Sequence, residues 1–204
     1  SSQAFSTAQS RTRKLRGIPS NAERAGGSWA AVDRYSGQNV RDRFMAANVS
    51  WWLNTLGEGT KIAIWAHNGH IARGLNEGLT WIVMGKHLSD VFGDNYLPIG
   101  FSFAEGNFNS FPRGAVEVTA EPLIPGCYEA ALQTTQLARF FIDLRELESG
   151  SAAHDWMIVE RPFQAIGGGP YSAPHYLGWD YPIVLPKSFD IIIHIETTTA
   201  TQVR

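Results

Sequence analysis

Segments whose apolar residues recur at helical spacing alternate along this chain with short apolar segments that are typical of strands. Residues 39–56 repeat apolar side chains every three or four positions, at Val40, Phe44, Ala47 and Trp51, and stop at Gly57, which predicts an amphipathic helix with these four residues on its buried face. Residues 62–66 form a short apolar run of β-branched, aromatic and small side chains, which is typical of a buried strand. A second helix is predicted over 80–92, because Gly93-Asp94-Asn95 provides an exit from it.

The second half of the chain continues the same alternation. Residues 96–103 predict the next buried strand, with Pro98 among its first residues. Residues 104–114 combine polar and aromatic side chains with glycine and predict a loop. The remaining predicted elements are a half-exposed strand over 115–120, a helix over 128–138, a strand over 140–144, an irregular lid or wall over 150–188 and a closing strand over 190–195.

Helices that alternate with short apolar strands are typical of the α/β class. We expect a three-layer sandwich in which helices flank a largely parallel central sheet, with residues 62–66 as an interior strand. Residues 37–204 predict a single domain, because they contain no repeat and no linker-like boundary. Residues 1–36 are rich in Ser, Gly, Ala and Arg and predict a poorly ordered arm or the remnant of a linker.

Composition narrows the classes of partner and location. The chain is 44% hydrophobic and 18% charged, and its net charge of −2 gives no support for a nucleic acid or an anionic membrane as partner. No apolar stretch reaches the roughly 20 residues that a membrane span needs, and no signal peptide pattern is present. The only cysteine, Cys127, excludes an intrachain disulfide and is compatible with a reducing compartment, so we expect a cytoplasmic location.

Candidate chemistry is concentrated at the end of the apolar run 62–66, where His67, Asn68, Gly69 and His70 follow one another. Open α/β sheets bind their ligands at the carboxyl ends of strands. Two imidazoles three residues apart suit proton transfer, stabilisation of an oxyanion or metal binding. The residues alone leave a second interpretation open, in which these histidines cap the next helix or bind loop carbonyls.

Two further sets of polar residues are candidates for the same site. Arg41 and Asn48 lie on one stripe of the helix predicted over 39–56, where they either face a pocket or lie at the surface. Glu105 lies in the loop predicted over 104–114, which fits a substrate-facing role and an ordinary loop equally well.

A serine nucleophile and a zinc ion are less favoured by the pattern. Ser102 comes within one residue of a nucleophile-elbow motif, but Phe101 and Phe103 flank it where that motif needs small residues. A catalytic zinc needs a third protein ligand beside two histidines. The candidates for that ligand stand at no recognised spacing, so we expect neither a metal nor another cofactor: Glu105, Asp143 and His194.

The chain resembles the erythromycin esterase family over about residues 38–200, and the match corresponds to the carboxyl-terminal half of such a protein. The motifs that carry the resemblance stand in the family's order: Arg-Asp-Arg-Phe-Met-Ala-Ala-Asn at 41–48, Trp-Ala-His-Asn-Gly-His at 65–70, Ile-Gly-Phe-Ser-Phe at 99–103, Gly-Cys-Tyr-Glu at 126–129, Phe-Ile-Asp-Leu-Arg at 141–145 and Phe-Asp-Ile-Ile-Ile at 189–193.

The resemblance implies a hydrolase that opens an ester or macrocyclic lactone, such as a macrolide antibiotic, by attack of water without a metal. Histidines, glutamates and an arginine in a deep cleft assist that reaction in the family. His67 and His70 match the histidines of the family's second half, and Arg41 matches the arginine that opens the helix motif. These three are the expected catalytic residues, and the expected substrate-binding residues are Asn48, Asn68, Phe103 and Glu105.

One departure from the family bears on activity. Members carry a first-half motif, Gly-Glu-Ser/Thr-x-His, whose histidine activates the water, and the sequence here offers only the partial match Gly57-Glu58-Gly59-Thr60. We therefore expect that a missing amino-terminal half of the fold, or a second chain, completes the site, and that the isolated chain is nearly inactive. The alternative is a non-catalytic binding or structural relative that retains the cleft.

Overall fold

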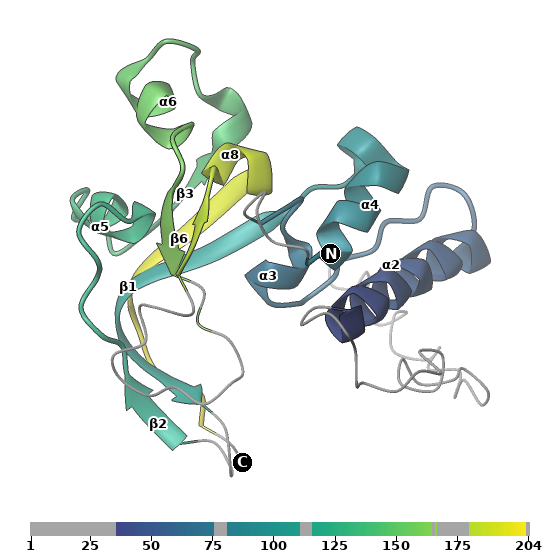
Figure 1. Ribbon diagram of the computed structural model, residues 1–204, viewed down its shortest axis with the longest axis horizontal. Helices are drawn as coiled ribbons and strands as arrows, with labels where there is room; N and C mark the ends of the chain where they lie inside the picture. Colours follow the sequence, from purple (N-terminus) through teal and green to yellow (C-terminus); the bar gives the residue numbers. More distant parts are fainter. Residues whose placement is uncertain (1–35, 76–80, 111–115, 165, 167–179, 203–204) are drawn as a thin grey trace, which may run out of the picture.

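The computed structural model describes residues 36–75, 81–110, 116–164, 166 and 180–202 (Figure 1). Apart from Ser36, the arm predicted over 1–36 lies outside these residues. In the described part of the chain, no helix is long and apolar enough to cross a membrane.

The first helices match the predicted pattern closely. Helix α2 spans Ser36–Leu56, which confirms a long helix at this place, and α4 spans Met84–Phe92 within the range predicted for the second helix. Between them lies the short helix α3, Asn68–Ile71. The other helical elements are the 3₁₀ turns η1 (Gly93–Asn95) and η2 (Leu144–Glu146) and the helices α5 (Tyr128–Gln133), α6 (Ala152–Met157) and α8 (Leu185–Ser188).

The buried face of α2 differs from the predicted one. Asp42 and Ala46 are buried and Val49 packs against the core, whereas Trp51, on the predicted apolar stripe, is exposed. Apolar periodicity misses this face because its most deeply buried member is a carboxylate.

The main sheet has four strands in the order β2-β1-β6-β3. Only the β1–β6 pairing is parallel, and β1–β2 and β3–β6 are antiparallel, so the α/β class is confirmed but the prediction of a largely parallel sheet is not. The connection from β1 to β2 is too short for the crossover that a parallel return requires. The strands are β1 (Ile99–Ser110), β2 (Val116–Thr119), β3 (Arg139–Asp143) and β6 (Ile191–Thr198), and a separate antiparallel pair joins β4 (Arg161–Gln164) to β5 (Asp180–Ile183).

The prediction of an interior strand over residues 62–66 is wrong for this structure. The segment belongs to neither a strand nor a helix. Ile64 and Ala66 pack against the core, while the side chain of Trp65 between them is 88% exposed. The apolar side chains of this segment are therefore buried on only one of its two sides. Among the described residues, no strand pairs with it.

Two other boundaries also differ from the sequence pattern. Residues 104–110 continue β1 and do not form a loop, because Asn107 and Asn109 pair with β2. The Asn107 side chain also donates to Glu117 of β2, and the Asn109 side chain donates to the Thr201 carbonyl. Residues 150–188 contain α6, β4, β5 and α8, and the part of this range over 167–179 lies outside the described residues.

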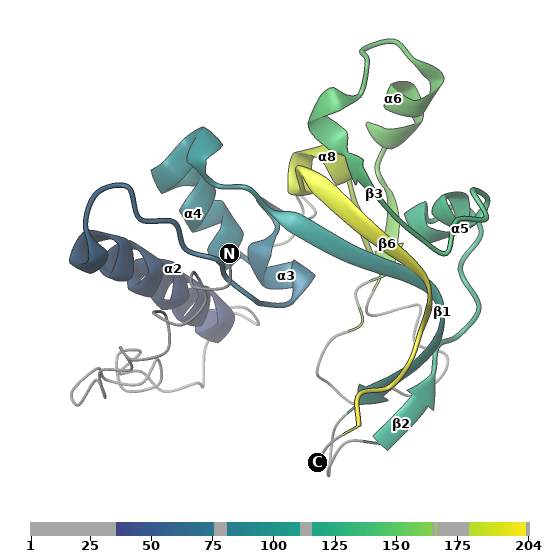
Figure 2. The same cartoon turned by 180° about the vertical axis from the view of Figure 1, so that it is seen from behind.

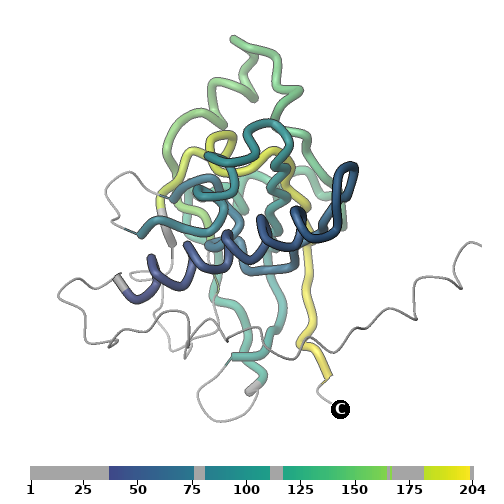
Figure 3. Tube along the Cα trace, turned by 90° about the vertical axis from the view of Figure 1, so that its right-hand side faces the viewer, coloured from purple at the N-terminus to yellow at the C-terminus, as the bar shows by residue number. Residues whose placement is uncertain are grey.

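The helices lie in two groups on either side of β1. Helices α2, α3 and α4 lie together on one side, and α5 and α6 lie on the other (Figures 1 and 2). From the side, α2 runs across the direction of β1 and β6 (Figure 3). One core joins both groups, with Tyr128, Phe189 and Ile192 among its fully buried side chains.

Candidate functional site

A buried carboxylate on α2 organises the candidate site. Asp42 is fully buried, and its Oδ1 accepts hydrogen bonds from His70 Nδ1 at 2.6 Å and from the Met84 backbone N–H at 3.0 Å. Its Oδ2 accepts a hydrogen bond from Trp81 Nε1 at 3.1 Å. A buried carboxylate is tolerated when donors satisfy its oxygens, and Asp42 thereby ties α2 to α3 and to the start of α4.

The contact between Arg41 and His70 fixes the tautomer of the imidazole. Arg41 Nη2 lies 2.8 Å from His70 Nε2. A guanidinium can only donate, so Nε2 carries the lone pair and the proton resides on Nδ1, which donates it to Asp42. His70 is therefore neutral in this arrangement, and it connects a buried anion to the guanidinium of Arg41.

His67 caps α3. Its Nδ1 accepts a hydrogen bond from the Gly69 backbone N–H at 3.0 Å, and its Nε2 lies 2.7 Å from the carbonyl oxygen of Ile166 and must carry the proton. Desolvation lowers the pKa of His67 below 6.5, although the hydrogen bond to Ile166 acts in the opposite direction. His67 is thus a neutral capping residue with both ring nitrogens engaged, as the capping interpretation of the sequence expected.

Asn68 attaches α3 to the edge of the main sheet. Its Nδ2 donates to the Phe101 carbonyl at 2.6 Å, and its Oδ1 accepts from the Phe101 N–H at 3.0 Å. One amide side chain therefore satisfies the main chain of β1 where a neighbouring strand would otherwise do so. A role for Asn68 in binding substrate would have to come in addition to this positioning role.

The other predicted substrate-binding residues lie on helix α2 and strand β1. Asn48 is half-buried on α2, two turns beyond Arg41. Phe103 is half-buried on β1, and its ring lies 6.2 Å from that of Phe108. Glu105 is exposed on β1 and accepts a hydrogen bond from Thr197 Oγ1 at 3.3 Å. The structure thus brings Arg41, both histidines and Asn68 together around α3 and sets Phe103 and Glu105 further along β1.

Ser102 is placed in a way that disfavours a nucleophilic role. Its Oγ lies 2.9 Å from His194 Nδ1, and His194 Nε2 lies 3.6 Å from Glu196 Oε2. Ser102 and His194 are buried in register on β1 and β6, and burial lowers the pKa of His194 while Glu196 opposes that effect. An attacking hydroxyl needs access to substrate, so we interpret these residues as a polar contact inside the sheet.

Within the described ranges, no group of three or more His, Cys, Asp or Glu side chains is placed to hold a metal ion. The ring nitrogens of His67 and His70, which would be the metal ligands, all have hydrogen-bond partners within the protein.

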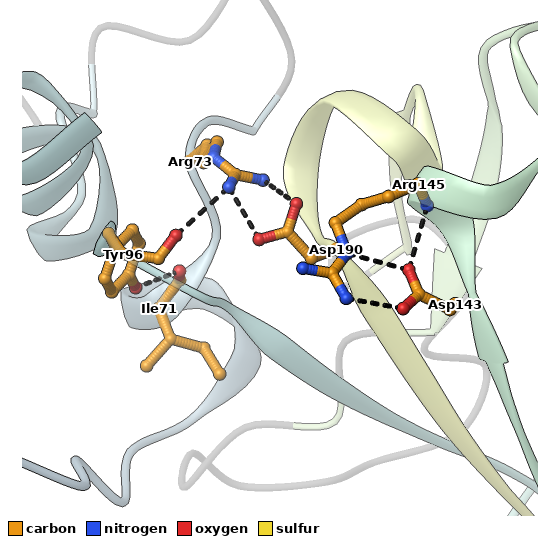
Figure 4. A network of polar contacts seen from close by, with 6 residues as sticks. All are labelled: Ile71, Arg73, Tyr96, Asp143, Arg145 and Asp190. Atoms are coloured by element: carbon orange, nitrogen blue, oxygen red, sulfur yellow. Dashed lines mark hydrogen bonds and ion pairs between the residues drawn. The ribbon is translucent and has the colours of Figure 1, made fainter. Parts of the chain in front are cut away.

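A second network anchors α3 from its other end (Figure 4). Arg73 donates to both oxygens of Asp190 at 2.7 and 2.6 Å, and its Nη2 also donates to the Tyr96 carbonyl at 3.1 Å. The Tyr96 hydroxyl in turn donates to the Ile71 carbonyl at 2.5 Å. Bidentate pairing of arginine with a carboxylate is geometrically specific, so it fixes the helix that carries His70 to the start of β6.

Asp42 is the functional candidate that sequence reasoning missed. A charged residue inside a helical motif is most often solvated, and only its spacing could have indicated otherwise. Asp42, Ala46 and Val49 recur at steps of four and three and define the face that is buried.

Comparison with known proteins gives one family and several relatives. The family model described as erythromycin esterase matches residues 5–198. The chain is 23% identical over 167 residues to the putative hydrolase YbfO of Bacillus subtilis, covering 78% of this chain and 35% of that protein. It is 33% identical over 71 residues to erythromycin esterase type II of Escherichia coli, covering 33% of this chain and 17% of that protein.

Solved structures show a similar fold. A succinoglycan biosynthesis protein is 28% identical with a TM-score of 0.67, over 79% of this chain and 38% of its own. An erythromycin esterase mutant in its open conformation, 18% identical with a TM-score of 0.55, matches 80% of this chain and 38% of its own. The chain therefore spans between a third and two fifths of the length of the relatives that match most of it.

Proposed function

The chain belongs to the erythromycin esterase family, and we propose that it supplies part of a hydrolase site that acts on a carboxylic ester or a macrocyclic lactone. The observation that carries this proposal is the chain of hydrogen bonds from buried Asp42 through neutral His70 to Arg41. Through these contacts, Asp42 and His70 define the orientation of the Arg41 guanidinium.

Arg41 is the group that we assign to the developing negative charge. When water attacks an ester, the carbonyl oxygen becomes an oxyanion, and preorganised donors aimed at that oxygen lower the barrier. A guanidinium carries five N–H donors and His70 accepts from one of them at Nη2, so Arg41 has donor capacity beyond its contact with His70. His70 assists by holding Arg41, and Asp42 assists by holding His70.

Activation of the water needs a group that these residues do not offer. Both ring nitrogens of His67 and of His70 are engaged, so neither presents a free lone pair to a water molecule. General-base catalysis contributes about 10²- to 10⁴-fold. We propose that a histidine of the family's Gly-Glu-Ser/Thr-x-His type, from the part of the fold that relatives carry outside the match, supplies the base.

Several finer features belong to the same proposal. Contacts to the substrate are assigned to Asn48, Asn68, Phe103 and Glu105, and macrolides fall within the proposed substrate class. A three-layer sandwich with a more parallel sheet is proposed for the fold once the remaining part is present. A cytoplasmic location is proposed from the single, buried Cys127.

A second candidate function is non-catalytic binding by a relative that retains the cleft. The complete engagement of both imidazoles favours it, because a structural histidine has the same contacts. Binding of a lactone without turnover, measured by calorimetry, is the result expected for this function.

The test uses a complement, which we define as the part of YbfO outside the match, produced as a separate polypeptide. We expect no turnover of p-nitrophenyl butyrate or of a macrocyclic lactone by the chain alone or by the complement alone. Turnover should appear when the two are mixed, and an Arg41→Met chain should lose it. Equal turnover by the complement alone, or none by the mixture, would refute the proposed hydrolase site.

A further inference from the structure

We propose that Trp65, Phe101, Ile193 and Phe141 form a docking surface for the part of the fold that relatives carry outside the match. We call these four residues the aromatic surface. The proposal rests on the proposed function only in its choice of occupant, and it concerns a surface separate from the Arg41–His70 contact.

The four side chains are contiguous. Phe101 on β1 is opposite Ile193 on β6, and Ile193 is opposite Phe141 on β3. Residues directly opposite one another in a sheet point to the same face. The Trp65 ring packs edge-on against the Phe101 ring, with 5.4 Å between their centroids. The aromatic surface therefore extends from the segment before α3 across three strands.

Among the described residues, the aromatic members of this face are exposed and Ile193 between them is half-buried, whereas the opposite face is buried. Trp65 is 88% exposed, Phe141 is 69% exposed and Phe101 is 38% exposed. On the other face, the neighbouring Ile192 and His194 of β6 are fully buried. Single exposed apolar residues are ordinary, but a contiguous apolar patch of this kind marks an interaction site.

The edge of β1 beside the aromatic surface is open as well. Strand β1 pairs with β6 over Ile99–Gly106, and within the described residues β2 covers the other edge only from Asn107 onward. At Phe101 the open edge is satisfied by the side chain of Asn68. Open edges invite pairing with a further strand, so a partner can combine main-chain pairing with apolar contact here.

The occupant follows from the lengths of the relatives. The succinoglycan biosynthesis protein matches 79% of this chain at a TM-score of 0.67, yet the match covers only 38% of that protein. More than half of that protein therefore lies outside the matched region and needs a surface to pack against. The exposed face and the open edge of β1 offer it apolar contact and main-chain pairing together. We commit to this part of the fold, represented by the complement, and a second copy of this chain becomes an outcome of the test.

The test compares thiol labelling at two exposed positions. Phe141→Cys places a thiol on the aromatic surface, and Val91→Cys places one on α4, where Val91 is 65% exposed. The native Cys127 gives little background, because it is 4% exposed and burial raises its pKa to about 11. Each variant is labelled with a maleimide alone and with saturating complement, and the mass of each species is measured.

We expect a one-to-one complex in which Phe141→Cys reacts at least tenfold more slowly and Val91→Cys reacts unchanged. A Trp65→Cys variant should show the same protection, which guards against a local defect at Phe141. If the Phe141→Cys thiol is protected in the chain alone and that species has the mass of a homodimer, the occupant of the aromatic surface is a second copy of this chain and not the complement. A complex that leaves both thiols reactive, or no complex at all, would overturn the proposal.

Labelling and turnover can fail separately. Protection of Phe141→Cys without ester hydrolysis would retain the docking surface and remove the proposed hydrolase function. Hydrolysis by the mixture with Phe141→Cys still fully reactive would do the reverse.

Discussion

Replacing Asp42 by asparagine tests whether the buried carboxylate holds the site together. In the native structure Oδ1 accepts from His70 and Met84 while Oδ2 accepts from Trp81. Asparagine has only one acceptor oxygen, so its NH₂ group must face at least one of these donors. A buried donor left without a partner costs about 1–3 kcal/mol. We therefore expect Asp42→Asn to lower the free energy of unfolding by about 2 kcal/mol, and Asp42→Ala, which orphans all three donors, by more.

The assay is urea unfolding followed by circular dichroism, with Asp90→Asn as the matched control. Asp90 is an exposed carboxylate on α4 that pairs with Lys86 at 2.5 Å. Exposed pairs of this kind contribute at most about 1 kcal/mol and usually less, so the control should unfold close to the native midpoint. An Asp42→Asn variant as stable as Asp90→Asn would refute the inference that Asp42 organises α2, α3 and α4.

Two further predictions concern packing and pH. Gly85→Ala should lower the free energy of unfolding by about 2–3 kcal/mol in the same assay, because its Cβ would lie 2.2 Å from the Ala72 carbonyl oxygen, while Gly74→Ala, which meets nothing within 4 Å, should change it little. Equal midpoints for the two alanine variants would contradict this close approach of α3 and α4. Stability should fall as the pH drops below 6.5, because burial lowers the pKa of His194 and the unfolded chain then binds the proton more readily. The loss should be smaller in His194→Gln between pH 7.5 and 5.5, and stability that stays constant or rises toward pH 5.5 in the native chain would contradict it.

Local signals in the sequence were sufficient for the elements that depend on spacing. Helix α2 and strand β6 match predicted elements, and the motif around His67 and His70 forms the N-cap and the single turn of α3. The sequence predicts an interior strand over 62–66 because composition reports apolar character and not pairing, and the structure has no strand there. Whether a segment forms a strand depends on hydrogen bonds to a neighbouring strand, which the local sequence pattern does not encode.

The role of Asp42 was hidden for a related reason. Its burial depends on donors from Trp81 and Met84, about 40 residues further along the chain, and spacing within α2 cannot reveal them. The parallel or antiparallel order of strands likewise depends on long-range pairing. Residue chemistry predicts the proximity of Arg41 and His70, but the tertiary contacts that separate Phe103 and Glu105 from them have no local signal.

If His70 orients Arg41 for hydrolysis, its loss must lower the kcat of the His70→Asn chain mixed with the complement. The asparagine amide nitrogen can replace Nδ1 as donor to Asp42, but it leaves Arg41 without the contact at Nε2. We predict that kcat falls by about 10²- to 10³-fold, the loss typical of one oxyanion donor, while His87→Asn on α4 retains native kcat. A His70→Asn chain with kcat within threefold of native would show that His70 does not orient Arg41 for hydrolysis.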